Sequence, residues 1–207
     1  MYPPLNNHFV FPLCLSLYSS YLMKFFSAML LCGSIMLAAC QPKVCPTEQK
    51  ADDDVSDWKI FLKKEMPLLG HRNWIVVTDM AYPLQTNPGI TTLFATEPYD
   101  EVVKVVDCMI KEASHVFAHI YQDQEQQVLS EKLAPGWNDY KARLSQVLDL
   151  SNVQFMPHEE LIFRLDEVSR LCQVVIIKTL LTIPYTSTFF ELDCGYWDGE
   201  REATIRK

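Results

Sequence analysis

The feature that most constrains the fold is a pair of short apolar segments rich in β-branched residues. Trp74–Thr78 and Val174–Ile177 contain no charged side chain. Such segments are typical of strands buried on both faces, as in a parallel sheet covered by helices. Amphipathic segments with helical periodicity lie between them along the chain. We therefore expect an α/β fold with three layers, in which a mostly parallel, mixed sheet lies between helices.

The remaining elements are expected to alternate in the same way over residues 56–197, which we treat as one domain followed by a tail at 198–207. Helices are predicted at 57–65 (capped by Ser56), 99–113, 125–133, 137–148 and 158–171. Strands are predicted at 116–121, 153–156 and 188–192, and a loop at 82–89. In the helix at 158–171, the spacing places Leu161, Leu165 and Leu171 on the buried side.

Residues 1–39 contain a single charged side chain, Lys24, and such a long apolar stretch is typical of a targeting or membrane segment. Read from Met23, Lys24 precedes an apolar region, and Leu37-Ala38-Ala39-Cys40 then resembles the lipobox of bacterial lipoproteins. We expect residues 1–39 to form a signal region, and we expect translation to start at Met23 within it. A lipid on Cys40 and a polar tether over 40–55 would then anchor the domain to a membrane of the bacterial cell envelope. The alternative is a transmembrane helix over residues 9–39.

The net charge of −8 argues against a nucleic-acid partner, because such a partner requires a basic face. His115 and His119 have a spacing that would serve a metal ion on a helix, but they fall in a predicted strand region and no third ligand is evident. We therefore predict no metal site.

Cys45, Cys108, Cys172 and Cys194 form no zinc-binding pattern. A disulfide is permitted in an exported protein. For the last three of these cysteines, however, buried free thiols are the favoured interpretation, because each lies in an apolar segment.

Several polar residues fall at or near the ends of predicted strands, where ligands bind in sheets of this kind. Asp79 follows the strand at 74–78, and Lys178 follows the strand at 174–177, with Tyr185 a few residues later. His158 opens a predicted helix directly after a strand, and His71 lies in the turn before Trp74–Thr78. We expect these side chains to line one polar pocket.

Four segments, taken in order, resemble the D-ribose pyranase and L-fucose mutarotase (RbsD/FucU) family. They are Leu69-Gly70-His71-Arg72-Asn73 with Asp79-Met80-Ala81-Tyr82-Pro83 after the strand, Pro157-His158-Glu159-Glu160, Val175-Ile176-Ile177-Lys178-Thr179, and Pro184-Tyr185-Thr186-Ser187. The resemblance extends from about Trp58 to Trp197. It implies an RbsD-like fold.

The resemblance also implies an activity, the interconversion of anomers, or of pyranose and furanose forms, of a free monosaccharide. His71 would be the general acid/base, a role that suits a group titrating near neutral pH. The implied sugar-binding residues are Asp79, His158, Lys178, Tyr185, Thr186 and Ser187. No metal or organic cofactor is implied, and the expected assembly is a homo-oligomeric ring whose neighbouring subunits build the site together. For His158 we expect the helix dipole to disfavour the imidazolium form.

Three departures from the family pattern leave an alternative open. Asn73 stands where the family has an acidic residue, Leu180 follows Lys178-Thr179 in place of glycine, and Ser187 replaces asparagine. The alternative is a non-catalytic sugar-binding or assembly lipoprotein on the same fold. A third interpretation, a lipoprotein with only an interaction role, predicts no polar pocket around the residues named above.

Overall fold

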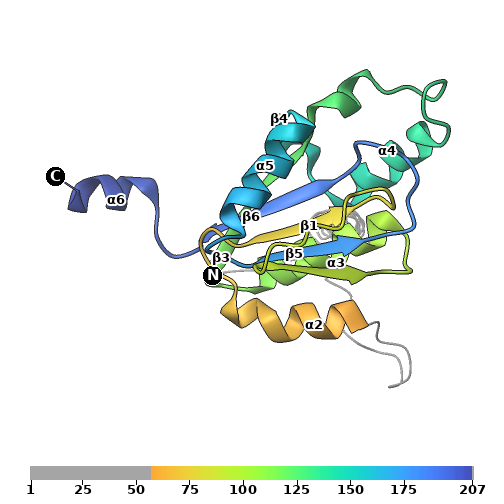
Figure 1. The fold of residues 1–207 in the computed structure, drawn as a ribbon. Helices are drawn as coiled ribbons and strands as arrows, with labels where there is room; N and C mark the ends of the chain where they lie inside the picture. Colours follow the sequence, from red (N-terminus) through yellow and green to blue (C-terminus); the bar gives the residue numbers. More distant parts are fainter. Residues whose placement is uncertain (1–56, 207) are drawn as a thin grey trace, which may run out of the picture. The chain divides into compact units, whose positions relative to one another are not determined.

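A computed structural model describes residues 57–206 of the chain, so the signal region, Cys40 and the tether at 40–55 lie outside the described residues. A six-stranded mixed sheet with the strand order β2-β5-β1-β6-β3-β4 forms the middle layer (Figure 1). The strands are β1 (Trp74–Thr78), β2 (Ile90–Phe94), β3 (Val116–Asp123), β4 (Val153–Met156), β5 (Val174–Lys178) and β6 (Thr188–Cys194). β5 is parallel to β1 and β2, β3 is parallel to β4, and β6 is antiparallel to both β1 and β3.

Helices cover both faces of this sheet, so the predicted α/β fold class is confirmed. α2 (Asp57–Glu65), α3 (Tyr99–Glu112) and α4 (Trp137–Val147) pack on one face, and α5 (His158–Val168) packs on the other (Figure 1). α6 (Gly199–Ile205) follows β6. The short 3-10 helices are η1 (Met66–Leu68), η2 (Gln124–Val128) and η3 (Leu150–Asn152). Among the helices of residues 57–206, none is long and apolar enough to cross a bilayer.

The continuous apolar runs of the central strands are explained by burial on both faces. In β1, Ile75 and Val77 belong to the core beneath α2, α3 and α4, whereas Trp74 and Val76 belong to the core beneath α5. All five β1 residues are buried. A strand alternates its side chains between faces, so a strand covered on both sides requires an apolar residue at nearly every position.

One predicted element is wrong, and two observed elements were not predicted. Residues 125–133 do not form an α-helix, because Val128 and Leu133 are exposed and only Leu129 of the predicted apolar face packs against the core. β2 was not predicted, since Ile90–Phe94 is a half-buried edge strand with two threonines. α6 was also not predicted, although the Asp198 carboxylate accepts the Arg201 N–H as an N-cap.

The helix predicted at 158–171 ends earlier than expected. α5 stops at Val168, and the chain then turns toward β5 through hydrogen bonds from Leu171 and Cys172 to the Val168 carbonyl. Leu161 and Leu165 are fully buried as predicted. Leu171 lies in the turn and is 92 % exposed, so its predicted place on the buried side was wrong.

The cysteines also differ from the prediction. Cys108, in α3, takes part in a disulfide bond, so the favoured interpretation of a free thiol was wrong there. Cys172 and Cys194 are free and half-buried. A disulfide is characteristic of oxidising compartments.

Leu165, in α5, and Leu171, in the turn after it, provide a matched test of the packing. Leu165→Ala is expected to lower the free energy of unfolding by about 2–5 kcal/mol, because it removes buried methyl groups and leaves a cavity. Leu171→Ala makes the same chemical change at an exposed position and should stay within about 0.5 kcal/mol of wild type. Urea unfolding of both variants measures the difference. Equal losses would show that α5 does not cover the sheet as described.

Candidate functional site

The strand directions bring several predicted site residues to one edge of the sheet. Because β6 is antiparallel to both β1 and β3, those two strands run in the same direction, as do their parallel partners. The carboxyl ends of β1, β3, β4 and β5 therefore lie at one edge, together with the amino end of β6. We call this the carboxyl edge. It carries Asp79, Lys178, His158 and the turn at 185–187, and ligands bind at such edges in open α/β sheets.

A histidine–carboxylate pair is the central feature of this edge. His158 Nδ1 lies 2.9 Å from Asp123 Oδ1, and the Asp123 side chain is completely buried. The Glu125 carboxylate accepts the His158 backbone N–H at 3.0 Å, so it caps the start of α5. His158 Nε2 makes no hydrogen bond with the residues that the structure describes. One ring nitrogen is thus fixed and the other is free for chemistry.

The electrostatics of the pair differ from the sequence-based expectation. The hydrogen bond with Asp123 raises the pKa of His158 above its ordinary value, against the lowering effect of burial. Burial raises the pKa of Asp123. The helix dipole was expected to disfavour the imidazolium form of His158, and this was wrong, because the neighbouring carboxylate outweighs the dipole. Asp123 was missed because the predicted strand ended at Tyr121, two residues too early.

The turn before β6 closes over the histidine. Tyr185 adopts a left-handed backbone conformation with φ 57°, and its ring meets the His158 ring edge-on at 5.4 Å. Ser187 is fully buried and its hydroxyl has no partner among the described residues. Thr186 has a structural role, because its hydroxyl donates to the Ile183 carbonyl and its own carbonyl accepts the Tyr140 hydroxyl. A sugar-binding role for the Thr186 side chain stays a prediction.

Asp79 and Lys178 occupy the ends of two neighbouring strands. Asp79 is 7 % exposed, and its carboxylate accepts the Ala81 N–H at 2.8 Å. Lys178 Nζ donates to the Tyr82 carbonyl oxygen. The Tyr82 ring lies edge-on to His158 at 6.5 Å. Burial raises the pKa of Tyr82, and the charges of Asp123 and Asp79 raise it further.

Unpartnered polar atoms gather at this edge. In residues 57–206, Thr78 Oγ1, Asp123 Oδ2 and Ser187 Oγ are buried and have no hydrogen-bond partner. Buried polar groups are nearly always paired in native proteins, so each exception calls for a water or ligand group. These three oxygens lie at the edge that also carries His158, Lys178 and two tyrosines, so this edge is the candidate functional site.

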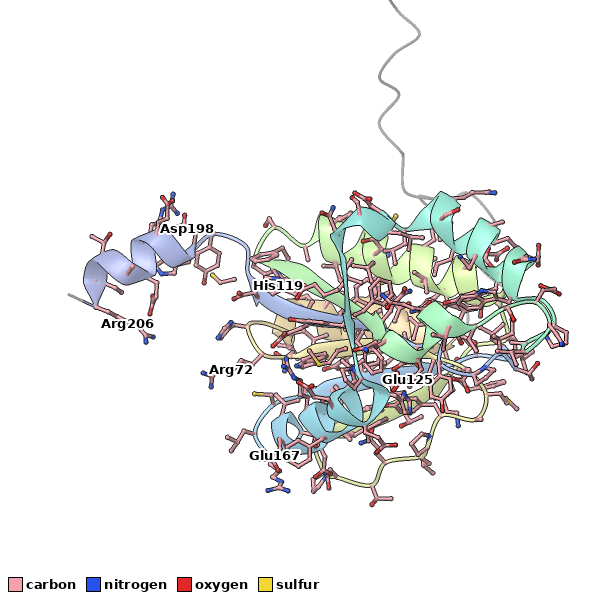
Figure 2. The ribbon with its side chains drawn as sticks, turned by 90° about the horizontal axis from the view of Figure 1, so that it is seen from above. Arg72, His119, Glu125, Glu167, Asp198 and Arg206 are labelled. Atoms are coloured by element: carbon pink, nitrogen blue, oxygen red, sulfur yellow. The ribbon has the colours of Figure 1, made fainter. Side chains whose placement is uncertain are left out.

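His71, the predicted general acid/base, does not lie at the carboxyl edge. It precedes β1, whereas Asp79 follows it, and at about 3.3 Å per residue the five-residue strand separates them by roughly 16 Å. Figure 2 shows Arg72 and His119 on the side of the domain where β6 leads to α6, away from Glu125. One chain therefore does not unite His71 with Asp79, His158 and Tyr185, and the catalytic role of His71 stays a prediction.

His71 nevertheless has a carboxylate partner of its own. Its Nδ1 lies 2.7 Å from Asp193 Oδ1, and His119 Nε2 lies 3.4 Å from the other oxygen. Burial raises the pKa of Asp193, but the Cys194 N–H and the two histidines lower it more, so its net shift is downward. Asn73 is used elsewhere, because its side chain accepts the Gly70 N–H and donates to the Gln173 carbonyl. Asp193, on β6, thus supplies the carboxylate that Asn73 lacks.

His115 and His119 do not share a ligand position. His115 Nε2 contacts the Leu69 carbonyl at 2.9 Å, whereas His119 faces Asp193. His115 lies in the turn before β3, and His119 lies within that strand. Within the described part of the chain, no three histidine, cysteine, aspartate or glutamate side chains are grouped so that they could hold a metal ion.

Comparison with known proteins finds similarity only among solved structures. No family model matches the chain, and no curated protein matches its sequence. RbsD of Bacillus subtilis, solved with D-ribose, is 17 % identical with a TM-score of 0.45 over 70 % of this chain and 98 % of its own. The fucose mutarotase of Streptococcus pneumoniae, solved with L-fucose, is 18 % identical with a TM-score of 0.43 over 64 % and 91 %. FucU of Bifidobacterium longum is 10 % identical with a TM-score of 0.44 over 65 % and 94 %.

The Asp123–His158 contact predicts a measurable titration. In wild type, His158 should titrate above pH 6.5, the usual value for histidine. Asp123→Asn removes the negative charge, so the His158 pKa should fall toward or below that value. The ring C–H signals in NMR spectra recorded from pH 5 to 9 measure both values. His115 provides the control, because its ring contacts the Leu69 carbonyl instead. An unchanged His158 pKa in the variant would contradict the assignment.

The same shift has a consequence for stability. A histidine whose pKa is higher in the folded state stabilises the protein fully below its unfolded pKa, about 6.5, and loses this contribution as the pH rises through the folded value. The difference in unfolding free energy between wild type and His158→Gln should therefore decrease from pH 6 to 8. Urea unfolding at several pH values measures it. A difference that grows over this interval would contradict the raised pKa of His158.

Proposed function

We propose that the chain is a monosaccharide mutarotase or pyranase, whose carboxyl edge binds a free sugar and opens its ring by acid/base catalysis. The observation that carries the proposal is the Asp123–His158 pair at this edge, with Nε2 of the histidine free. The motif order in the sequence supports the same substrate class. The unpartnered oxygens of Thr78, Asp123 and Ser187 supply acceptors, and the two hydroxyls also supply donors, for sugar hydroxyl groups.

The reaction needs two proton-transfer groups. A base takes the proton from the anomeric hydroxyl, and the electron pair of that O–H bond forms the carbonyl as the bond from the anomeric carbon to the ring oxygen breaks. An acid protonates the departing ring oxygen at the same time. Closure on the other face, or through another hydroxyl, reverses these transfers, so no oxidant, reductant or metal is consumed. Histidine can take either part near neutral pH.

Within one chain, His158 is the only histidine at the carboxyl edge of the described residues. We propose that the second proton-transfer group is His71 of another copy, held by its own Asp193. This arrangement agrees with the ring of subunits that the resemblance implies. It also explains why the two histidines each have a carboxylate although they lie at opposite edges. Asp79, Lys178 and Tyr185 would then bind the sugar between the copies.

We further propose that the domain works at the bacterial cell envelope, anchored through a lipid on Cys40 after removal of residues 1–39. The apolar N-terminal stretch, in which Lys24 is the single charged side chain, and the Leu37–Cys40 pattern support this location. The disulfide at Cys108 supports it as well, since disulfides persist mainly outside the reducing cytoplasm.

Exchange between sugar anomers tests the proposal. The full chain, purified in mild detergent, is expected to accelerate exchange of at least one sugar in a panel of pentoses and hexoses, measured by saturation-transfer NMR. His71→Ala and His158→Gln should each reduce this acceleration by about 10²-fold or more, because each removes a proton-transfer group. His115→Gln, which changes a histidine outside the site, is the control and should retain the wild-type rate.

Mixing variants tests the shared site. If His71 and His158 act from different copies, a refolded mixture of His71→Ala and His158→Gln regains up to about a quarter of the wild-type rate, since random assembly restores some complete sites. If the mixture does not recover activity, the site is not shared between copies, whereas the mutarotase proposal is unaffected. Sugar binding without any acceleration by wild type would instead establish the alternative, a non-catalytic sugar-binding or assembly protein.

A further inference from the structure

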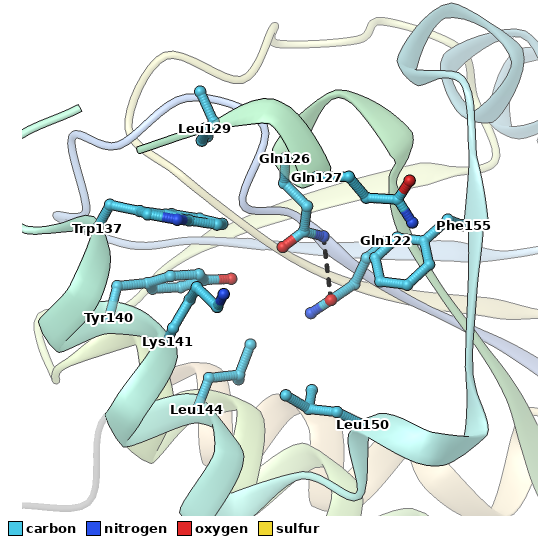
Figure 3. Close-up of a pocket in the computed structure, with 10 residues that line it drawn as sticks. All are labelled: Gln122, Gln126, Gln127, Leu129, Trp137, Tyr140, Lys141, Leu144, Leu150 and Phe155. Atoms are coloured by element: carbon cyan, nitrogen blue, oxygen red, sulfur yellow. Dashed lines mark hydrogen bonds between the residues drawn. The ribbon is translucent and has the colours of Figure 1, made fainter. Parts of the chain in front are cut away.

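A cavity lies on the α4 side of the sheet, away from His158. Its volume is about 150 Å³, and side chains from β3, η2, α4, η3 and β4 line it (Figure 3). Gln122 and Asp123 are consecutive in β3, and strand side chains alternate between faces. Gln122 therefore faces the cavity, whereas Asp123 faces His158. The cavity and the proposed sugar site are thus separated by the sheet.

A chain of hydrogen bonds fixes the orientation of the amides in the cavity wall. The Tyr99 hydroxyl donates to the Thr186 carbonyl, so the Thr188 hydroxyl, 2.8 Å away, must donate to Tyr99. Thr188 then accepts the Gln122 amide N–H at 3.1 Å. The Gln122 oxygen in turn accepts a Gln126 N–H at 3.0 Å. The donors in this chain all point the same way, from Gln126 toward Thr186, although the Tyr99 hydroxyl also lies 3.3 Å from the Val77 carbonyl oxygen.

This polarity leaves one acceptor unused inside the cavity. Gln126 is only 7 % exposed, and its Oε1 accepts no hydrogen bond from the residues that the structure describes. Figure 3 shows this oxygen directed into the space in front of Trp137 and Tyr140. An unpartnered acceptor that faces the cavity favours a ligand that brings a hydrogen-bond donor.

The rest of the lining indicates that the ligand has an apolar part and a negative charge. The walls are mainly apolar or aromatic and include Leu129, Leu144, Leu150 and Phe155. The only charged side chain in the lining is Lys141, an exposed residue whose Nζ lies 5.6 Å from the centre of the Trp137 ring. No ion pair holds this ammonium within the described chain. An anionic group at the mouth of the cavity therefore has an available partner.

We propose that this cavity binds a small aromatic hydroxy acid. Its ring packs among the leucines and Phe155, its hydroxyl donates to Gln126 Oε1, and its carboxylate pairs with Lys141 at the mouth. A cavity of this size is sufficient for a benzene ring. A monosaccharide fits this lining poorly, because most of its hydroxyls would lose water against apolar walls without gaining partners. The proposal therefore does not depend on the function assigned to the carboxyl edge.

Three probe ligands and the full chain in mild detergent test the assignment by isothermal titration calorimetry. Wild type should bind 4-hydroxybenzoate about three- to tenfold more tightly than benzoate, which lacks the hydroxyl. It should bind 4-hydroxybenzoate about two- to fivefold more tightly than phenol, which lacks the carboxylate. Gln126→Leu should abolish the first preference, and Lys141→Met the second. Lys104→Met changes an exposed lysine on α3 and should leave both preferences intact.

Two outcomes would overturn the proposal. One is the absence of saturable 4-hydroxybenzoate binding to wild type at millimolar concentration. The other is that 4-hydroxybenzoate, benzoate and phenol bind equally well. If Gln126→Leu does not fold, the comparison of the probes on wild type and on Lys141→Met decides the question, because Lys141 is exposed and its substitution leaves the core unchanged.

Discussion

The strand β6, which lies between β1 and β3, holds the whole sheet together. β6 pairs antiparallel with both neighbours and joins two groups of parallel strands into one sheet. Its amino end delivers Tyr185 and Ser187 to the carboxyl edge, and its other end delivers Asp193 to His71. One strand thus contributes to two histidine–carboxylate arrangements at opposite edges. The antiparallel pairing also aligns the carboxyl ends of β1 and β3, so that Asp79 and Asp123 lie at the same edge of the sheet.

The carboxyl edge carries buried polar atoms without hydrogen-bond partners, as binding sites do. Asp123 is completely buried, yet one of its oxygens has no partner in the described chain, and the Ser187 hydroxyl beside it is in the same condition. Unpaired buried oxygens destabilise the folded protein, because they lose hydrogen bonds to water without gaining others. They are tolerated where a ligand or bound water completes their hydrogen bonds, and here they lie next to a histidine that can move protons.

Much of this arrangement was predictable from local patterns. The unbroken apolar run of Trp74–Thr78 predicts a strand covered on both faces, and the stripe of valines in Tyr99–Glu112 predicts a helix. The positions of Asp79, Lys178 and His158 at strand ends follow from these elements. Asp123 escaped prediction because the strand that carries it continues two residues beyond the apolar pattern. The partnership of Asp193 with His71 depends on an antiparallel pairing across 122 positions, which no local pattern encodes.

The same limitation applies to Leu171 and Cys108. Helical spacing places Leu171 on the face of Leu161 and Leu165, but the chain leaves the helix before reaching it, and the side chain is exposed. A cysteine in an apolar stripe is typical of a buried thiol, and only tertiary contact turns Cys108 into half of a disulfide. Periodicity therefore locates elements and strand ends, whereas partners distant in sequence depend on how the sheet is assembled.

Sugar binding at the carboxyl edge is tested by the NMR signal of the His158 ring during titration of the protein with the sugar that exchanges fastest. We expect a saturable shift of this signal and no shift of the His115 signal, because His158 lies at the carboxyl edge and His115 does not. If the His158 signal stays fixed while the sugar binds elsewhere, the carboxyl edge is not the sugar site.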